Sequence, residues 1–149
     1  MKKFFLILIL ILGMTSFVKA EPLQRFGTAI LPDGTKLVLE LATTPEQWVT
    51  GLMYRRSLRQ NSGMLFIYDE PGAYSFWMKN CFIHLDIIWL SQDSKIVYFV
   101  ENVPPCDQPD CPSYGGMQLA KYVIETTPGS VKRHKLKLGD SIALKVFDK

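Results

Sequence analysis

Short apolar runs separated by turn-forming residues are the feature that most constrains the fold of this chain. The tripeptide Pro32-Asp33-Gly34 is a clear turn signal, because proline presets φ, aspartate can form an Asx turn and glycine supplies a positive φ. Three hairpins are predicted, over residues 26–42, 64–80 and 85–100. Further strands are expected at residues 122–125 and 142–147. The pattern predicts a mainly β (α+β) fold, a compact barrel-like antiparallel or mixed sheet with one or two short helices.

One segment carries a strong helix signal. Thr44 can act as the N-cap, Pro45 occupies the first helical position, and Gln47 stands where a capping box needs Glu or Gln. We expect this helix to end near residues 55–56. Gly51, inside it, indicates close approach of a neighbouring element, most often a strand. A second short helical or irregular piece is expected after residue 129.

The first twenty residues have the anatomy of a cleaved secretory signal. Lys2 and Lys3 precede an unbroken apolar run over residues 4–12, and residues 18–20 form a small-residue cleavage site. An uncleaved anchor is the alternative, but the run is short for a span of about 20 residues. We therefore expect an exported protein, periplasmic or extracellular, with one β-rich domain over residues 21–149.

Removal of the signal changes the charge balance. The chain has 17 Lys+Arg and 14 Asp+Glu, a net charge of +3, and three of the lysines lie in residues 1–20. The remaining chain therefore carries 14 residues of each sign and no net charge. This balance gives no electrostatic reason to expect nucleic acid or an anionic membrane as a partner, and we expect a monomer.

The three cysteines fit an oxidising compartment. Cys106 and Cys111 lie in a proline-bounded loop, which favours a local disulfide. A zinc site is the alternative, but three Cys and two His without paired spacing argue against it. Cys81 is expected to be a buried free thiol.

The stretch from Phe76 to Leu90 places polar groups inside a strongly apolar run, where each costs free energy if it is buried unpaired. The candidate ligand-facing or structural cluster consists of Lys79, Asn80, Asp86, Arg55 and Arg56, with Trp77 or Trp89 as an apolar wall. In the structural alternative, these residues form a network that pins the helix to the sheet, and a backbone group, a lysine or an arginine is the partner of Asp86.

Other kinds of site receive less support from the sequence. Met78, Cys81 and His84 are soft potential copper ligands, but strand geometry points Cys81 away from the other two. No motif frames a Ser or Cys nucleophile, and there is no glycine-rich phosphate loop or dinucleotide fingerprint. We therefore expect no metal, no cofactor and no assignable catalytic residue.

Several blocks together resemble the family called domain of unknown function 192. They are Gly51-Leu-Met-Tyr-Arg-Arg-Ser-Leu58, Gly63-Met-Leu-Phe66, Phe76-Trp-Met-Lys-Asn80, Leu85-Asp-Ile-Ile88 and Tyr122-Val-Ile-Glu125, followed by Gly129 and Leu138-Gly-Asp140. The resemblance implies a small, usually exported bacterial or archaeal protein with a compact β-rich fold and no firmly assigned activity. At Cys81 and His84 the family mostly has Thr and Pro, which makes these two residues poor candidates for a family-wide function.

Three functions remain open from the sequence. The favoured hypothesis is a small binding module for a polar small molecule, a glycan or an envelope component, acting through the polar cluster. The second is a small hydrolase-like enzyme that uses Asp86 as acid or base, which requires Asp86 to open to a pocket beside a second ionisable group. The third is a purely structural or interaction protein.

Overall fold

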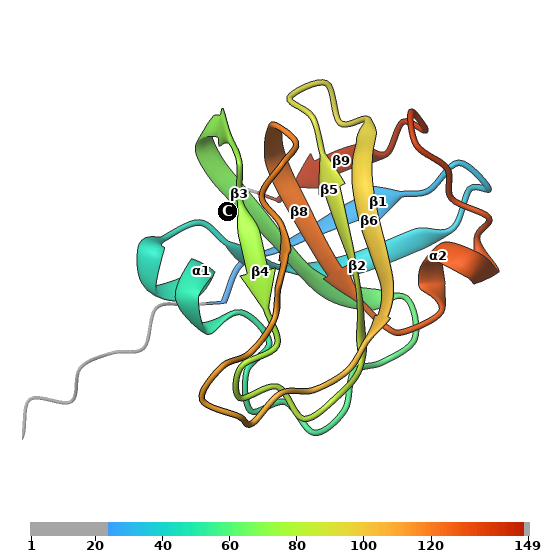
Figure 1. Ribbon diagram of the computed structural model, residues 1–149. Coiled ribbons are helices and arrows are strands. Elements are labelled where there is room, and N and C mark those ends of the chain that lie inside the picture. Colours follow the sequence, from blue (N-terminus) through green and yellow to red (C-terminus); the bar gives the residue numbers. More distant parts are fainter. Residues whose placement is uncertain (1–23, 148–149) are drawn as a thin grey trace, which may run out of the picture.

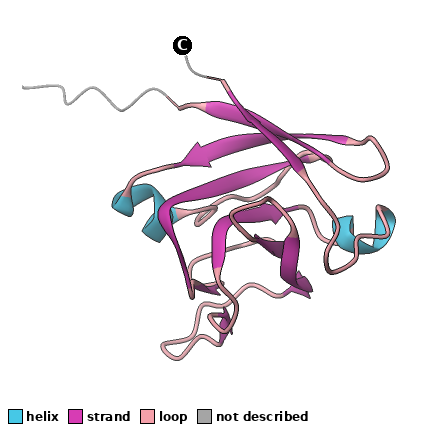
Figure 2. Ribbon diagram, turned by 90° about the horizontal axis from the view of Figure 1, so that it is seen from above, coloured by secondary structure: helices cyan, strands magenta, loops and turns pink. Residues whose placement is uncertain are grey.

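The computed structural model describes residues 24–147. The predicted signal over residues 1–20 lies outside this range. The strands are β1 (Phe26–Ile30), β2 (Lys36–Ala42), β3 (Ser62–Gly72), β4 (Ser75–Trp77), β5 (Leu85–Leu90), β6 (Ile96–Val103), β7 (Ser113–Gly115), β8 (Ala120–Thr126) and β9 (Ala143–Val146). The helices are α1 (Pro45–Thr50) and α2 (Ser130–Arg133), and they lie at opposite sides of the molecule (Figure 2).

Seven of these strands form one mixed sheet, in the order β6-β5-β8-β3-β2-β1-β9 (Figure 1). The mainly β fold with two short helices is therefore confirmed. The sheet is not closed into a barrel, because β6 and β9 remain its edges. They approach each other at one end, where Lys95 and Ser141 form an isolated bridge between the segments that precede these strands.

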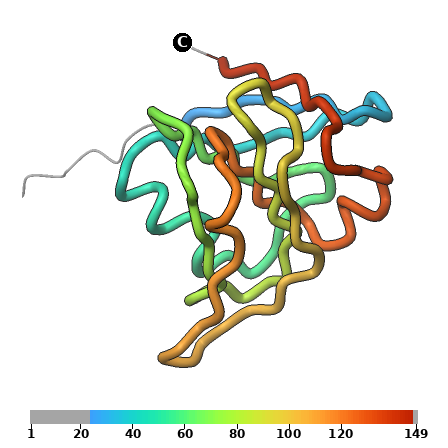
Figure 3. Tube along the Cα trace, turned by 45° about the horizontal axis from the view of Figure 1, so that its top comes forward, coloured from blue at the N-terminus to red at the C-terminus, as the bar shows by residue number. Residues whose placement is uncertain are grey.

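The local turn and cap signals of the sequence are confirmed. β1 and β2 form the predicted hairpin, and the amide of Thr35 donates to Asp33 Oδ1 over 2.8 Å. The capping box of Thr44 and Gln47 is present in full at the start of α1. β5 and β6 form the hairpin predicted over residues 85–100, and β6 continues to Val103. The first and last strands described, β1 and β9, are antiparallel neighbours (Figure 3).

The predicted hairpin of residues 64–80 is wrong. β3 pairs with β8 and, in parallel, with β2, whereas β4 pairs with β7 in a separate two-stranded sheet. The physical reason is the packing of Phe76, whose ring meets Phe66 of β3 at 4.8 Å and Trp89 of β5 at 5.7 Å. These contacts hold β4 over one face of the large sheet instead of along an edge. β7 then fits because Gly115 has no side chain, since a Cβ there would lie 2.5 Å from the Trp89 ring.

The predicted end of the first helix near residues 55–56 is also wrong. α1 ends at Thr50, because Gly51 takes a positive φ of 47° and a ψ of −131°. Tyr54 also has a positive φ, and its amide donates to the carbonyl of Asn80. The segment after α1 is therefore tied to the turn that follows β4.

Alternation along the central strands separates two apolar cores. Leu65 of β3, Ile88 of β5 and Ile124 of β8 belong to the core on one face. Their strand neighbours belong to the other core, the first core, which lies beneath α1 and β4; examples are Phe66, Ile87 and Val123. β5 is buried at all six positions, as expected for a strand covered on both faces.

Candidate functional site: a carboxyl group beneath the first helix

Glu125 stands at the centre of the sheet, on the face of the first core. β8 pairs it with Met64 of β3 on one side and with Ile87 of β5 on the other, and both belong to the first core. By alternation, Val123 is on the same face and Ile124 on the opposite one. The glutamate therefore takes a position where the strand pattern calls for an apolar side chain.

The Glu125 carboxyl group is buried and only half satisfied. Its residue is 3% exposed, and the backbone amide of Leu52 donates a hydrogen bond to it. Oε2 is buried and has no hydrogen-bond partner in the described part of the chain. Burial raises the pKa of Glu125 to about 8, and the Leu52 hydrogen bond only partly offsets this shift. The carboxyl group is therefore protonated at neutral pH and can donate a hydrogen bond.

This carboxyl group faces a cavity of about 220 Å³, which we call the Glu125 pocket. Its lining comes from α1 and the turn after it, from β3, from β4 and its following turn, and from β8. The main apolar groups of the lining are Trp48, Leu52, Phe66, Phe76, Trp77 and Cys81. Concave, mostly apolar pockets with one or a few placed polar groups are the usual form of small-molecule sites.

Gly51 makes the close approach between α1 and the carboxyl group possible. A Cβ at this position would lie 3.1 Å from Phe66 Cζ and 3.4 Å from Glu125 Oε2. The expectation that Gly51 marks close approach of a neighbouring strand is therefore confirmed, and both contacts come from strand side chains. Trp48 is fixed beside it by a 3.0 Å hydrogen bond from its indole Nε1 to the carbonyl of Ala42.

Cys81 is the buried free thiol that the sequence predicts. Burial, followed by the nearby Glu125, raises the pKa of this thiol to about 12. The thiol therefore stays protonated at neutral pH and is a poor nucleophile. In the part of the chain that the structure describes, no three His, Cys, Asp or Glu side chains are grouped so that they could hold a metal ion.

Asp86 connects elements of the fold through hydrogen bonds to backbone amides. It is fully buried, and three backbone amides donate to its carboxylate: Asn102 at 2.8 Å, Gly129 at 3.0 Å and Val131 at 2.8 Å. Asn102 lies at an irregularity where β6 bulges against β5, and Gly129 and Val131 lie at the start of α2. Asp86 thus joins β5 to β6 and α2 through backbone partners and not through an arginine. This geometry lacks the open pocket that the Asp86 hydrolase hypothesis requires.

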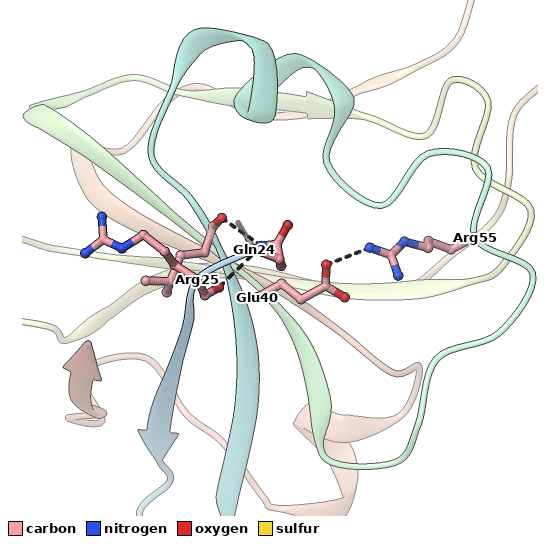
Figure 4. A network of polar contacts seen from close by, with 5 residues as sticks. Gln24, Arg25, Glu40 and Arg55 are labelled. Carbon is pink, nitrogen blue, oxygen red and sulfur yellow. Dashed lines mark hydrogen bonds and ion pairs between the residues drawn. The ribbon is translucent and has the colours of Figure 1, made fainter. Parts of the chain in front are cut away.

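The structure disperses the other predicted cluster residues. The Lys79 ammonium donates to the carbonyl of Gln108 at 2.6 Å, and Asn80 adopts a positive φ of 57° in a turn. Arg55 forms an ion pair with Glu40 at 2.6 Å (Figure 4), whereas Arg56 lies 5.7 Å from the Phe82 ring centroid. Of the candidate residues, Trp77 alone lines the Glu125 pocket.

The disulfide between Cys106 and Cys111 is present, as predicted. It closes the loop that contains Gln108, whose carbonyl accepts the hydrogen bond from Lys79. The backbone of this loop also pairs with the turn after β4, since Cys106 donates to Met78 and accepts from Asn80, both at 3.1 Å. Lys79 and Asn80 therefore hold the turn that carries Cys81 into the pocket wall.

Comparison with known proteins shows the family to which the chain belongs. Residues 28–144 match the family model DUF192, described as an uncharacterized ACR. The chain belongs to the DUF192 family. No curated protein matches it.

Two solved structures resemble this DUF192 protein at 30% identity or more. One is a Sinorhizobium meliloti protein described as "a putative transcription regulator", with 32% identity and a TM-score of 0.72 over 80% of this chain and 92% of that chain. Another is a protein of unknown function from Novosphingobium aromaticivorans, with 30% identity and a TM-score of 0.69 over 80% of this chain and 84% of that chain.

Sequence reasoning missed Glu125, although two signals could have found it. The residue ends the apolar run Tyr122-Val-Ile-Glu125, where a carboxyl group would be buried unless the strand had ended. In addition, four of the blocks that carry the family resemblance supply lining residues to one pocket, namely Gly51, Leu52, Met53, Phe66, Phe76, Trp77 and Glu125.

Proposed function

We propose that this DUF192 protein is a binding module whose ligand is a small molecule held in the Glu125 pocket. The observation that carries the proposal is the buried Oε2 atom, which faces a cavity and has no hydrogen-bond partner among residues 24–147. A polar atom left unpaired at a buried position costs about 1–3 kcal/mol. A ligand atom that accepts a hydrogen bond from this carboxyl group recovers that cost and so gains affinity.

The dimensions of the pocket favour a small molecule over the other occupants that the sequence leaves open. A cavity of about 220 Å³ encloses a single small ligand or one terminal group. A glycan chain or a folded envelope protein is recognised mostly over an extended groove or a broad surface. If the predicted export occurs, the ligand is a molecule of the periplasm or the cell exterior.

Binding is favoured over catalysis by the ionisation of the lining. Glu125 has the near-neutral pKa that suits a general acid or base, but such a group needs a reacting partner. Within the described residues, the other ionisable group of the lining is Cys81, whose thiol is neutral at physiological pH. The pocket therefore offers one hydrogen-bonding carboxyl group and no activated nucleophile.

The test is a fragment library screened by thermal shift and mapped by amide chemical shifts on the mature protein. A ligand that binds the native state raises the unfolding temperature by mass action. We expect hits to move the amides of Gly51 and Leu52, and to lose their effect in Glu125→Leu, which keeps a similar volume and removes the polar atoms. Glu101→Leu, at an exposed position of β6, is the matched control. Hits that map elsewhere, or that survive Glu125→Leu unchanged, contradict the proposal.

No helix among the described residues is long and apolar enough to cross a membrane. For the partners, we propose a monomer that does not bind nucleic acid and is not stably inserted in a membrane after removal of the signal. The absence of net charge once residues 1–20 are set aside supports the part of this proposal that concerns nucleic acid.

A further inference from the structure

The charges and walls of the Glu125 pocket restrict the chemistry of its ligand. As far as residues 24–147 form it, the lining includes no Lys, Arg or His, and its ionisable groups are Glu125 and Cys81. Both are neutral at pH 7, because burial raises the pKa of each. A charged group that entered this cavity would lose its hydration and find no counter-ion, which is strongly unfavourable.

The walls of the pocket favour a flat ring. Phe66 and Phe76 meet edge to face at 4.8 Å, and Trp48 packs on Tyr68 at 4.9 Å, so these rings are held in fixed orientations. Aromatic rings gain most from offset-stacked or edge-to-face contact with another flat ring. Trp77 is 49% exposed and Val49 is 69% exposed, although both belong to the lining. Their exposed apolar surface at the pocket can be covered by part of a bound ligand.

The size of the cavity indicates one ring. A cavity of about 150 Å³ with apolar walls is enough to hold benzene. The Glu125 pocket, with about 220 Å³, has room for one six-membered ring and a substituent of a few atoms. The unpartnered Oε2 atom defines what that substituent must do, because a protonated carboxyl group donates a hydrogen bond.

We propose that the Glu125 pocket selects an uncharged molecule with a single flat ring and one carbonyl-type hydrogen-bond acceptor, which Glu125 recognises as a hydrogen-bond donor. This inference rests on the proposed function and names the class of its ligand. The ring lies among Phe66, Phe76 and Trp77, and the acceptor meets Glu125. Anions and cations of the same size are rejected, because the lining supplies neither a cation nor a carboxylate at neutral pH.

The pH dependence of binding follows from the groups around Glu125. The groups that face it are the thiol of Cys81, the phenol of Tyr68 and the amide of Leu52. Burial raises the pKa of Cys81 to about 12 and also raises that of Tyr68. Between pH 6 and pH 9.5, Glu125 is therefore the group among these that ionises. Once it is ionised, it has lost its proton and repels the lone pairs of the acceptor.

The experiment measures the affinity of the mature protein for four probes, namely benzamide, benzoate, benzylammonium and glucose, by chemical-shift titration of the Gly51 and Leu52 amides. At pH 6 we expect benzamide to bind at least ten times more tightly than the other three. Raising the pH to 9.5 should lower the affinity of the native protein for benzamide at least fivefold. Glu125→Gln keeps a neutral donor, so its affinity for benzamide should not change with pH.

A pair of aromatic variants tests the wall. Trp77→Ala should weaken benzamide severalfold, whereas Phe82→Ala should leave its affinity unchanged. Phe82 is the matched control because it is 51% exposed, close to the 49% of Trp77, and lies outside the pocket lining.

The outcomes separate the inference from the proposed function. Binding of glucose or of a charged probe as tightly as benzamide overturns the ligand class and leaves the small-molecule function standing. Affinity for benzamide that is equal at pH 6 and pH 9.5 in the native protein overturns the donor role of Glu125, even if Glu125→Gln does not fold. If no probe and no library fragment moves the Gly51 and Leu52 amides, both the ligand class and the proposed function fail.

Discussion

Two carboxylic acids of adjacent strands, Asp86 and Glu125, are both fully enclosed, yet their surroundings differ in kind. Asp86 accepts hydrogen bonds from three backbone amides, which provide partners for both of its carboxyl oxygens. Glu125 accepts one amide and otherwise faces apolar groups, so burial raises its pKa to about 8. The first acid therefore joins elements of the fold, and the second presents a neutral carboxyl group to a cavity.

The raised pKa of Glu125 makes stability depend on pH. Its ordinary pKa is 4.5, and in the fold it is about 8. Between these values the unfolded chain loses the proton while the folded chain keeps it. The contribution of protonated Glu125 to the stability of the fold is therefore complete below pH 4.5 and is lost as pH rises through 8. The loss should be on the order of a few kcal/mol. Urea unfolding should therefore show that the free energy of unfolding of the native protein falls between pH 4 and pH 9, and that this fall is absent in Glu125→Gln. The same pH dependence in both proteins would contradict the prediction.

Asp86→Ala should destabilise the protein by about 3–5 kcal/mol, because it leaves three buried amide donors without an acceptor. The measurement is the free energy of unfolding in urea. Asp110→Ala, at an exposed position, is the matched control and should change that energy by less than about 0.5 kcal/mol. A similar small effect for Asp86→Ala would show that water or a local rearrangement replaces the carboxylate.

A buried acidic residue is easier to predict from the sequence than the groups that hydrogen-bond to it. Asp86 was recognisable as a polar group in an apolar run, but backbone amides carry no residue-specific signal. They come from Asn102, Gly129 and Val131, at sequence distances of 16, 43 and 45 residues. Glu125 escaped prediction for a related reason, since its importance comes from α1 and β4, which fold over it from elsewhere in the chain.

At the scale of elements, the short loop closed by the disulfide stabilises the base of β4. Loss of the Cys106–Cys111 bond should lower the free energy of unfolding by about 2 kcal/mol, because a closed loop restricts the unfolded chain. The double variant Cys106→Ser, Cys111→Ser, compared with the native protein in a denaturant titration, measures this effect. Equal stability of the double variant and the native protein would mean that Lys79 and the backbone pairs of residues 78–80 hold the loop unaided.

Elements governed by neighbouring residues were predicted well, and those governed by distant contacts were not. The cap of α1 and the Asx turn at Asp33 depend on residues within four positions of each other. The course of the segment after α1 and the pairing of β4 depend on Asn80, Trp89 and Gly115, which lie far away in the sequence. Periodicity shows that β3 and β4 are strands, but it does not show that β4 crosses the face of the sheet.

At the scale of the whole molecule, the open sheet has a stable centre and two exposed edges. Among the strands of residues 24–147, β8 and β3 have partners on both sides, whereas β9 pairs with β1 alone and β6 with β5 alone. Local opening requires the loss of fewer contacts at an edge than at the centre. The sheet should therefore lose its order from β9 inward.

Amide hydrogen exchange tests this gradient. We expect the amides of Ala143–Val146 to exchange at least about a hundredfold faster than those of Val123 and Ile124, because opening of β9 leaves both apolar cores largely intact. Exchange followed by NMR at several protein concentrations provides the control. Protection of β9 equal to that of β8 would contradict an open monomeric sheet. If that protection grew with concentration, strand addition by a second copy would explain it, since an unpaired edge is the surface on which another strand can pair.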